Sequence, residues 1–205
     1  MGASLALAVR SHYAHITGVA RRAEAVREAL ARGIVDTATT SFEDGVAGAD
    51  IVILATPVRK IIAQIGDLAG AAKAGAVITD LGSTKSQIIQ AMNQLPDHLR
   101  AVGSHPMCGK EITGLDAADA DLYRGKTWIL TRSTRTDDDA FAAVRTLAEN
   151  AGAVTLELDA ARHDLLVAFA SHLPYALAVA LVTATEQASL NDPALWQVTA
   201  SGFRD

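Results

Sequence analysis

The segment Gly103–Glu111 gathers residue types that can carry out acid–base chemistry. His105 follows an apolar run that is typical of a strand, and its imidazole titrates near neutrality, so it can take a proton from a bound alcohol. Lys110 and Glu111 follow closely and offer both signs of charge to a polar substrate. We therefore interpret His105 as a catalytic base, with a structural histidine as the alternative.

Two other turns follow apolar runs that predict buried strands. Thr56 and Pro57 come after Ile51–Ala55, and Ser83 comes shortly after Ala76–Asp80. Ligands of open α/β sheets bind beyond the carboxyl ends of the strands, so both turns are expected to pass close to a ligand. Ser83 can hydrogen-bond that ligand or cap the following helix, and its residue type leaves both roles open.

The first residues carry features that suit a dinucleotide. Gly2 opens a helical pattern, where the lack of a Cβ lets a helix pack closely on a sheet and aim its amides at a pyrophosphate. Ala20, Arg21 and Arg22 follow a strand-like run, at the place where a carboxylate would bind the ribose of NAD. Two guanidinium groups without that carboxylate favour NADP and tolerate NAD. An ordinary helix start with incidental arginines is the alternative.

The elements that must position these residues alternate along the chain. This alternation predicts an α/β fold with a doubly wound, mostly parallel sheet covered by helices on both faces. The expected strands are Ala14–Val19, Ile51–Ala55, Ala76–Asp80, Ala101–Ser104, Lys126–Thr131 and Val154–Leu158. The expected helices are Ser4–Arg10, Arg22–Arg32, Val58–Ala69, Thr84–Met92 and Asp137–Asn150. The chain begins in the first helix, so the opening strand and its glycine turn are expected to be missing.

A helical region is predicted from Asp159 onward, with a long helix that starts near Ala160 and stops before Asn191-Asp192-Pro193. Pro174 is expected to kink this helix. Leu165–Thr185 contains no charged residue, but its His, Pro, Tyr, Ser and Thr side chains favour a helix buried in a helical interface over a membrane span. His163 and His172 fall on opposite faces of the helix, so no metal site is expected from them.

Composition narrows the class of protein. The 205 residues are 50% hydrophobic and 20% charged, which is typical of a folded soluble chain. A net charge of −5 offers no basic surface for a nucleic acid. Cys108 is the only cysteine, which excludes an intramolecular disulfide and a multi-cysteine zinc site. With no positively charged leader at the start, a cytoplasmic protein is expected.

Taken in order, these segments resemble the prephenate and arogenate dehydrogenases of tyrosine biosynthesis. The resemblance implies an NAD(P)-binding domain of the Rossmann type over residues 1–158 and an all-helical domain over 159–205 that forms a homodimer. It implies oxidative decarboxylation of prephenate to 4-hydroxyphenylpyruvate, or of arogenate to tyrosine, with NADP or NAD. The pieces that carry it are Gly2–Ala6, Ala55–Pro57, Asp80–Lys85, Ser104–Glu111, Ser171–Tyr175 and Ser201–Asp205.

The resemblance also assigns roles to single residues. It makes His105 the residue that accepts the proton of the ring C4 hydroxyl and Ser83 the one that holds this hydroxyl in place. Glu111 resembles a gating and specificity residue, and His172 a residue that contacts the substrate. Further substrate contacts are expected from Lys110 and Tyr175. The cofactor is expected to contact Gly2, Ala20, Arg21, Arg22, Ala55, Thr56 and Pro57.

The chain departs from the family pattern at both ends. The first strand and two of the three glycines are absent, and the family's carboxylate-binding arginine lies beyond the closing Phe203-Arg204-Asp205. We therefore expect a truncated chain. Two alternatives stay open: another hydroxy-acid dehydrogenase with a Rossmann-type and a helical domain, and a non-catalytic module for dinucleotide binding or dimerisation. The residues do not separate prephenate from arogenate.

Overall fold

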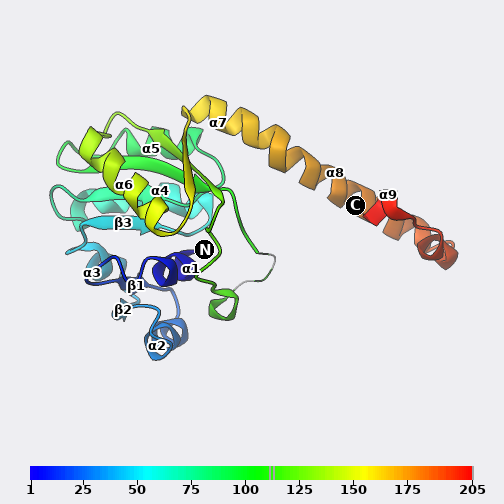
Figure 1. Ribbon diagram of the computed structural model, residues 1–205, viewed down its shortest axis with the longest axis horizontal. Helices are drawn as coiled ribbons and strands as arrows, with labels where there is room; N and C mark the ends of the chain where they lie inside the picture. Colours follow the sequence, from blue (N-terminus) through cyan, green and yellow to red (C-terminus); the bar gives the residue numbers. More distant parts are fainter. Residues whose placement is uncertain (111, 113, 205) are drawn as a thin grey trace. The chain divides into compact units, whose positions relative to one another are not determined.

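The structure of the protein is a computed structural model that describes residues 1–110, 112 and 114–204 (Figure 1). It divides into two compact units, Met1–His163 and Asp164–Asp205, and each is treated by itself.

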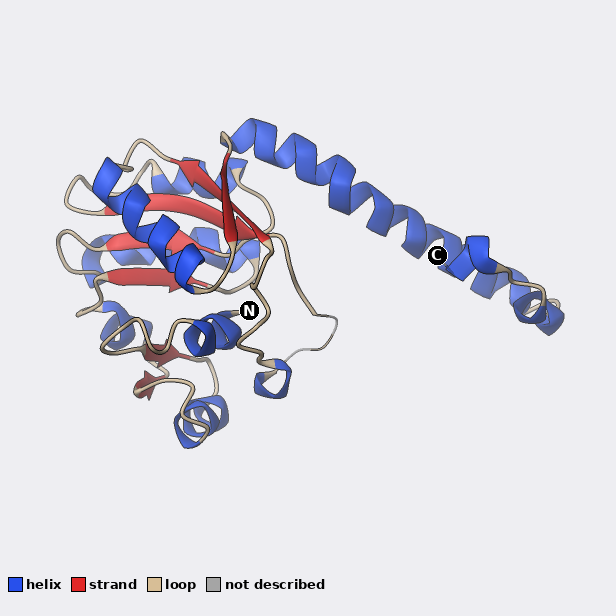
Figure 2. Ribbon diagram, in the orientation of Figure 1, coloured by secondary structure: helices blue, strands red, loops and turns tan. Residues whose placement is uncertain are grey.

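The first unit is built on a five-stranded sheet with the order β3-β4-β5-β6-β7 (Figure 2). Neighbouring strands are parallel except β5 and β6, which are antiparallel. A separate parallel pair, β1-β2, lies beside it. The strands are β1 (Thr17–Val19), β2 (Thr37–Thr39), β3 (Ile51–Leu54), β4 (Val77–Asp80), β5 (Arg100–Pro106), β6 (Thr127–Arg132) and β7 (Val154–Glu157).

Helices cover both faces of the five-stranded sheet, because successive strand residues point to opposite sides. Val77 packs into one apolar cluster with α1 and α6, and its neighbour Ile78 packs into a second cluster with α4 and α5. The predicted mostly parallel, doubly wound α/β fold is confirmed. The helices of this unit are α1 (Gly2–Ala8), α2 (Ala23–Ala31), α3 (Phe42–Val46), α4 (Val58–Ala71), α5 (Ser86–Met92), η1 (Leu115–Ala117) and α6 (Asp138–Asn150).

No strand of the described residues lies between β1 and β3, which is the place of the first strand in a doubly wound sheet. An apolar cavity of about 920 Å³ is found there, lined by residues of α1, β1 and β3. Its lining includes Leu5, Ile16, Val35, Ile51 and Ile53.

The second unit is helical. α7 (Ala160–Val167) begins in the first unit and continues through the π-helix η2 (Ala168–His172) into α8 (Leu173–Ser189); η3 (Pro193–Gln197) and α9 (Ser201–Arg204) follow. The expected stop of the long helix is confirmed, since α8 ends at Ser189. The Asp192 carboxylate then caps η3 by accepting from Ala194 N at 3.0 Å. At Pro174 the structure has a π-helical turn just before the proline, where a kink was expected. A proline has no N–H for the carbonyl four residues earlier, and a wider turn accommodates this loss.

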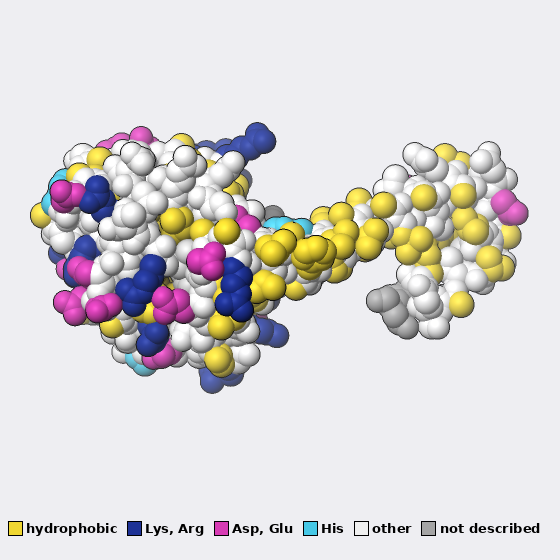
Figure 3. Space-filling model, turned by 90° about the horizontal axis from the view of Figure 1, so that it is seen from above, with side chains coloured by type: hydrophobic (Ala, Val, Ile, Leu, Met, Phe, Trp, Pro, Cys, Tyr) yellow, Lys and Arg dark blue, Asp and Glu magenta, His cyan; other side chains and the backbone are white. Residues whose placement is uncertain are grey.

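The helix Ala160–Ser189 is long and apolar enough to cross a membrane by length and composition, with a mean hydropathy of 2.0 over its most apolar stretch. Only 6% of that stretch is buried. Hydrophobic side chains follow its surface, among them Leu165, Phe169, Leu173 and Leu177 (Figure 3). In a single chain this apolar surface stays exposed, and apolar patches of this kind mark interaction sites.

Candidate active site

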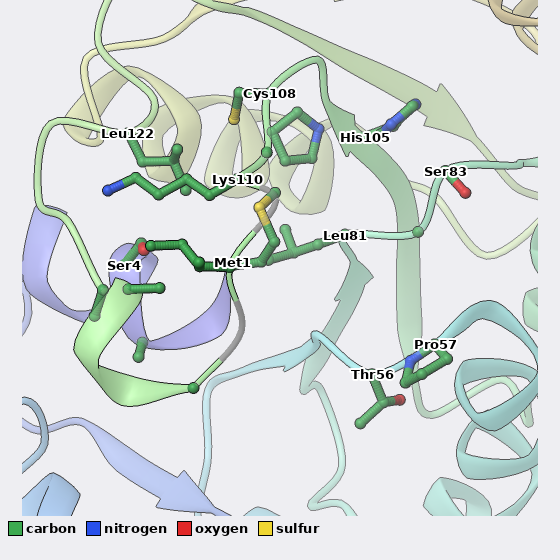
Figure 4. Close-up of a pocket in the computed structure, with 18 of the residues that line it drawn as sticks. Met1, Ser4, Thr56, Pro57, Leu81, Ser83, His105, Cys108, Lys110 and Leu122 are labelled. Carbon is green, nitrogen blue, oxygen red and sulfur yellow. The ribbon is translucent and has the colours of Figure 1, made fainter. Parts of the chain in front are cut away.

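A cavity of about 440 Å³ opens at the carboxyl ends of β3, β4 and β5 (Figure 4). These strands run in the same direction, so the turns that follow them meet at one edge of the sheet. The start of α1 and the loop after β5 complete the lining. The polar and turn residues around it are Ser4, Thr56, Pro57, Gly82, Ser83, His105, Cys108 and Lys110.

A buried ion pair underlies this edge of the sheet. Asp80, the last residue of β4, and Lys85 are both fully buried and paired. The Asp80 carboxylate also accepts from Gly82 N at 2.8 Å and from Ser104 N at 2.9 Å. Burial raises the pKa of the Asp80 carboxyl, while Lys85 and the two N–H groups oppose this shift. The network ties the turn that carries Ser83 to the residue that precedes His105.

His105 lies near the end of β5 and lines the cavity with 9% of its surface exposed. Its Nδ1 is 2.9 Å from Nε2 of His163, a fully buried residue in the first turn of α7. The two ring centroids are 5.1 Å apart. No local sequence pattern predicts the contact between His105 and His163, because the pairing of β5, β6 and β7 brings these two distant residues together.

Ser83 is exposed to the cavity and does not cap the helix that follows it. α5 begins at Ser86 with Lys85 at the cap position and without a side-chain cap bond, so the helix-cap alternative for Ser83 is wrong. The hydrogen bond from Gly82 N to the Asp80 carboxylate holds this turn against the end of β4, and α5 begins only after the turn, at Ser86. Ser83 and His105 thus line one cavity from neighbouring strand ends.

The candidate cofactor residues divide between this cavity and the apolar one. Gly2, Ala20 and Ala55 line the larger cavity, and Thr56 lines both. A Cβ added at Gly2 would lie 3.0 Å from Cβ of Ala55, so α1 approaches the end of β3 more closely than a larger residue permits. Pro57 directly precedes α4, as expected.

The exposed residues Arg21 and Arg22 lie in the turn between β1 and α2. No ion pair within the described ranges engages either guanidinium. Both remain accessible to an anionic ligand.

The remaining candidate residues are spread more widely. Lys110 lines the smaller cavity and forms an ion pair with Asp119 at 2.8 Å. Glu111 lies outside the described residues. His172 and Tyr175 belong to the second unit, where the Tyr175 side chain is exposed, so their contact with a substrate stays a prediction. Within the described part of the chain, no group of three or more His, Cys, Asp and Glu side chains could hold a metal ion.

Comparison with known families covers almost the whole chain. The model for the nucleotide-binding domain of prephenate dehydrogenase matches residues 5–157, and the model for the dimerization domain of prephenate dehydrogenase matches residues 159–205. The chain belongs to the prephenate dehydrogenase family. The resemblance inferred from the sequence is confirmed.

Individual members of the prephenate dehydrogenase family match over the full chain. The prephenate dehydrogenase of Bacillus subtilis is 33% identical over 100% of this chain and 56% of its own length. The cyclohexadienyl dehydrogenase of Zymomonas mobilis is 32% identical over 100% of the chain and 71% of its own length. The structure of Aquifex aeolicus prephenate dehydrogenase with hydroxyphenyl propionate and NAD+ superposes with a TM-score of 0.90 at 32% identity, covering 100% of this chain and 72% of that one. The chain thus spans 56% of the Bacillus subtilis protein.

Proposed function

We propose that this chain carries the active site of a dehydrogenase that oxidatively decarboxylates prephenate or arogenate, giving 4-hydroxyphenylpyruvate or tyrosine. The observation that carries the proposal is the cavity in which His105 and Ser83 lie at adjacent strand ends, in a chain of the prephenate dehydrogenase family. A base and a hydroxyl group at this edge of the sheet suit a substrate whose alcohol loses a proton as its carbon is oxidised.

The residues present fit a nicotinamide dinucleotide, NADP or NAD. Gly2 brings α1 against the end of β3 without a Cβ in the way, and the adjoining cavities share Ala3 and Thr56, so one extended ligand can reach both. Gly2, Ala20, Ala55, Thr56 and Pro57 would hold it along the strand ends. When bound, the nicotinamide ring accepts the hydride that leaves ring C4 of the substrate.

The protein's own side chains move the proton of the ring C4 hydroxyl and position the substrate. His105 takes the proton of the ring C4 hydroxyl, and Ser83 holds that hydroxyl beside the imidazole. As C4 loses its hydride and becomes a carbonyl carbon, the bond to the ring carboxylate breaks and CO2 leaves. Its electron pair enters the ring, the C4 oxygen takes the proton back from His105, and the ring becomes an aromatic phenol. Lys110, Glu111, His172 and Tyr175 are the proposed contacts to the rest of the substrate.

We further propose that residues 1–158 form the dinucleotide-binding domain and that residues 159–205 take part in a homodimer. The exposed apolar surface of the helix Ala160–Ser189 supports this, since a second copy would remove it from water without a membrane. The protein is then a soluble enzyme, and the cytoplasm is its proposed place.

The test is turnover of the purified chain with prephenate and with arogenate, each with NAD and NADP, followed by absorbance of the reduced cofactor. Reduction of either cofactor that depends on one of these substrates would support the proposal. Turnover of a different hydroxy acid alone would contradict it, as would binding of the dinucleotide without turnover of any substrate.

The preference between NADP and NAD should depend on the side chain at position 20. Replacing Ala20 with Asp places a carboxylate where the adenosine ribose is proposed to lie, which repels a 2′-phosphate and accepts from a 2′-hydroxyl. We expect the Kd ratio of NADP to NAD to rise by about tenfold or more, on the scale of a 1.4 kcal/mol change in relative binding. Ala20→Asn is the uncharged control, and an unchanged ratio in Ala20→Asp would place the ribose elsewhere.

Cys108 reports on occupation of the cavity without any turnover. Burial is the main cause that raises the pKa of its thiol, so little thiolate forms near neutral pH and alkylation by iodoacetamide should be slower than for free cysteine. Because Cys108 lines the proposed site, saturating NAD or NADP should slow alkylation by a further tenfold or so, a loss of access worth about 1.4 kcal/mol. Mass spectrometry follows the single cysteine. A rate unaffected by either dinucleotide would contradict the proposed cofactor site.

A further inference from the structure

We propose that His163 is a positioning residue that holds His105 in the tautomer with its proton on Nδ1. The inference rests on the proposed function, in which His105 receives the proton of the substrate. It starts from the 2.9 Å contact between Nδ1 of His105 and Nε2 of His163, both of which belong to the first unit.

A hydrogen bond between two imidazoles needs one N–H and one lone pair. If His163 donates through Nε2, then the neutral ring of His105 must carry its proton on its own Nε2, and that nitrogen cannot act as a base. If His105 donates through Nδ1, then Nε2 of His105 keeps its lone pair. Only the second arrangement is compatible with proton uptake at Nε2. His163 must therefore be the acceptor, with its own proton on Nδ1.

The same contact serves the protonated state of His105. After Nε2 takes the proton, His105 is an imidazolium, and its Nδ1–H becomes a charge-assisted donor to the lone pair of His163. Such a bond is shorter and stronger than the neutral one, so it stabilises the charge that develops during the reaction. A fully buried acceptor makes this effect larger than it would be in water.

The backbone holds His163 in register with His105. In the sheet, His105 lies opposite Ile129 of β6, which lies opposite Leu156 of β7. The chain leaves β7 and enters α7 through Asp159, whose carboxylate caps the first turn and whose carbonyl accepts from His163 N at 2.9 Å. The acceptor thus lies on a helix that begins directly after the last strand of the sheet that carries the base.

Two substitutions separate a hydrogen-bond role from a packing role. His163→Phe keeps a planar ring of similar size and removes the lone pair, whereas His163→Gln loses the ring and keeps an acceptor oxygen near the position of Nε2. If His163 acts only by packing, the Phe variant should resemble the wild type and the Gln variant should not. If it acts as an acceptor, the order is reversed.

The first readout is the tautomer of His105, measured in the 205-residue chain by two-bond ¹⁵N–¹H correlations of labelled histidine under conditions where the ring is neutral. We expect the Nδ1–H form in the wild type and in His163→Gln, and a shift towards the Nε2–H form in His163→Phe. The assignment comes from loss of the signals in His105→Asn. His98→Phe, at an exposed histidine, is the control for a general effect of the substitution.

The second readout is steady-state kinetics. We expect kcat of His163→Phe to fall by about a hundredfold, the lower range for losing an effective general base, with the KM of substrate and cofactor within about threefold. His163→Gln should retain at least about a tenth of kcat, because the acceptor remains. If the Phe variant does not fold, His163→Met replaces it in the same comparison.

An unchanged His105 tautomer in His163→Phe, or a Phe variant more active than the Gln variant, would overturn the proposal. Wild-type chain without turnover of prephenate or arogenate would count against the proposed function instead. The tautomer measurement needs no substrate, so the two failures can be told apart.

Discussion

Replacing His105 with Asn should lower kcat for prephenate or arogenate by about a hundredfold or more, the loss expected when a general base is removed. Asn keeps a polar group near the position of Nδ1, so the contact to His163 and the fold should persist while proton uptake at Nε2 is lost. KM should change little, because the imidazole acts on the transition state more than on binding. Steady-state kinetics of the purified variant measure both constants.

The matched control is His98→Asn, which changes an exposed histidine that does not line the cavity and should leave kcat as it is. Thermal unfolding of both variants shows whether the fold is kept. Normal turnover in His105→Asn would remove this residue from the mechanism.

The second large effect is on stability. Replacing Lys85 with Met leaves the Asp80 carboxylate fully buried without its cation, and we expect the free energy of unfolding to fall by about 3–5 kcal/mol. Urea denaturation, followed by circular dichroism, measures this loss. The turn with Ser83 should loosen as well, since Asp80 binds both Gly82 N and Ser104 N.

Two further variants serve as controls for the effect of Lys85→Met. Lys73→Met breaks the exposed ion pair with Asp50 and should cost under about 1 kcal/mol. The double variant Asp80→Asn, Lys85→Met removes both charges of this pair and should regain part of the stability lost in Lys85→Met. A Lys85→Met variant no less stable than Lys73→Met would show that the buried pair contributes nothing to the fold.

The elements that could be predicted from the sequence are those with a strong apolar pattern. All of Val77–Asp80 and the middle four residues of Thr127–Arg132 are buried. The helix Asp138–Asn150 carries an apolar face and an N-terminal cap at Asp137. The type and place of these elements therefore follow from local chemistry. By contrast, β2 (Thr37–Thr39) has only three residues, two of them threonines, and no local apolar pattern predicts a strand there. Its pairing with β1 is what makes it a strand.

The site shows the same division. Cavity residues at strand ends, including Thr56, Ser83 and His105, could be predicted because a parallel sheet gathers its carboxyl ends at one edge. The contact of His105 with His163 could not, since it depends on the antiparallel pairing of β5 with β6 and on where α7 begins. The pairing of Asp80 with Lys85 was also missed, although the two residues lie in one segment, because only burial makes their contact matter.

The role of His105 is tested most directly by a crystal structure of the protein with a nicotinamide dinucleotide and a phenolic product analogue. We expect the phenolic oxygen within about 3.2 Å of Nε2 of His105, the reach of a general base, with the nicotinamide ring beside it in the cavity at the ends of β3, β4 and β5. A ligand bound elsewhere, or a phenolic oxygen out of hydrogen-bond reach of His105 while the dinucleotide is in place, would contradict it.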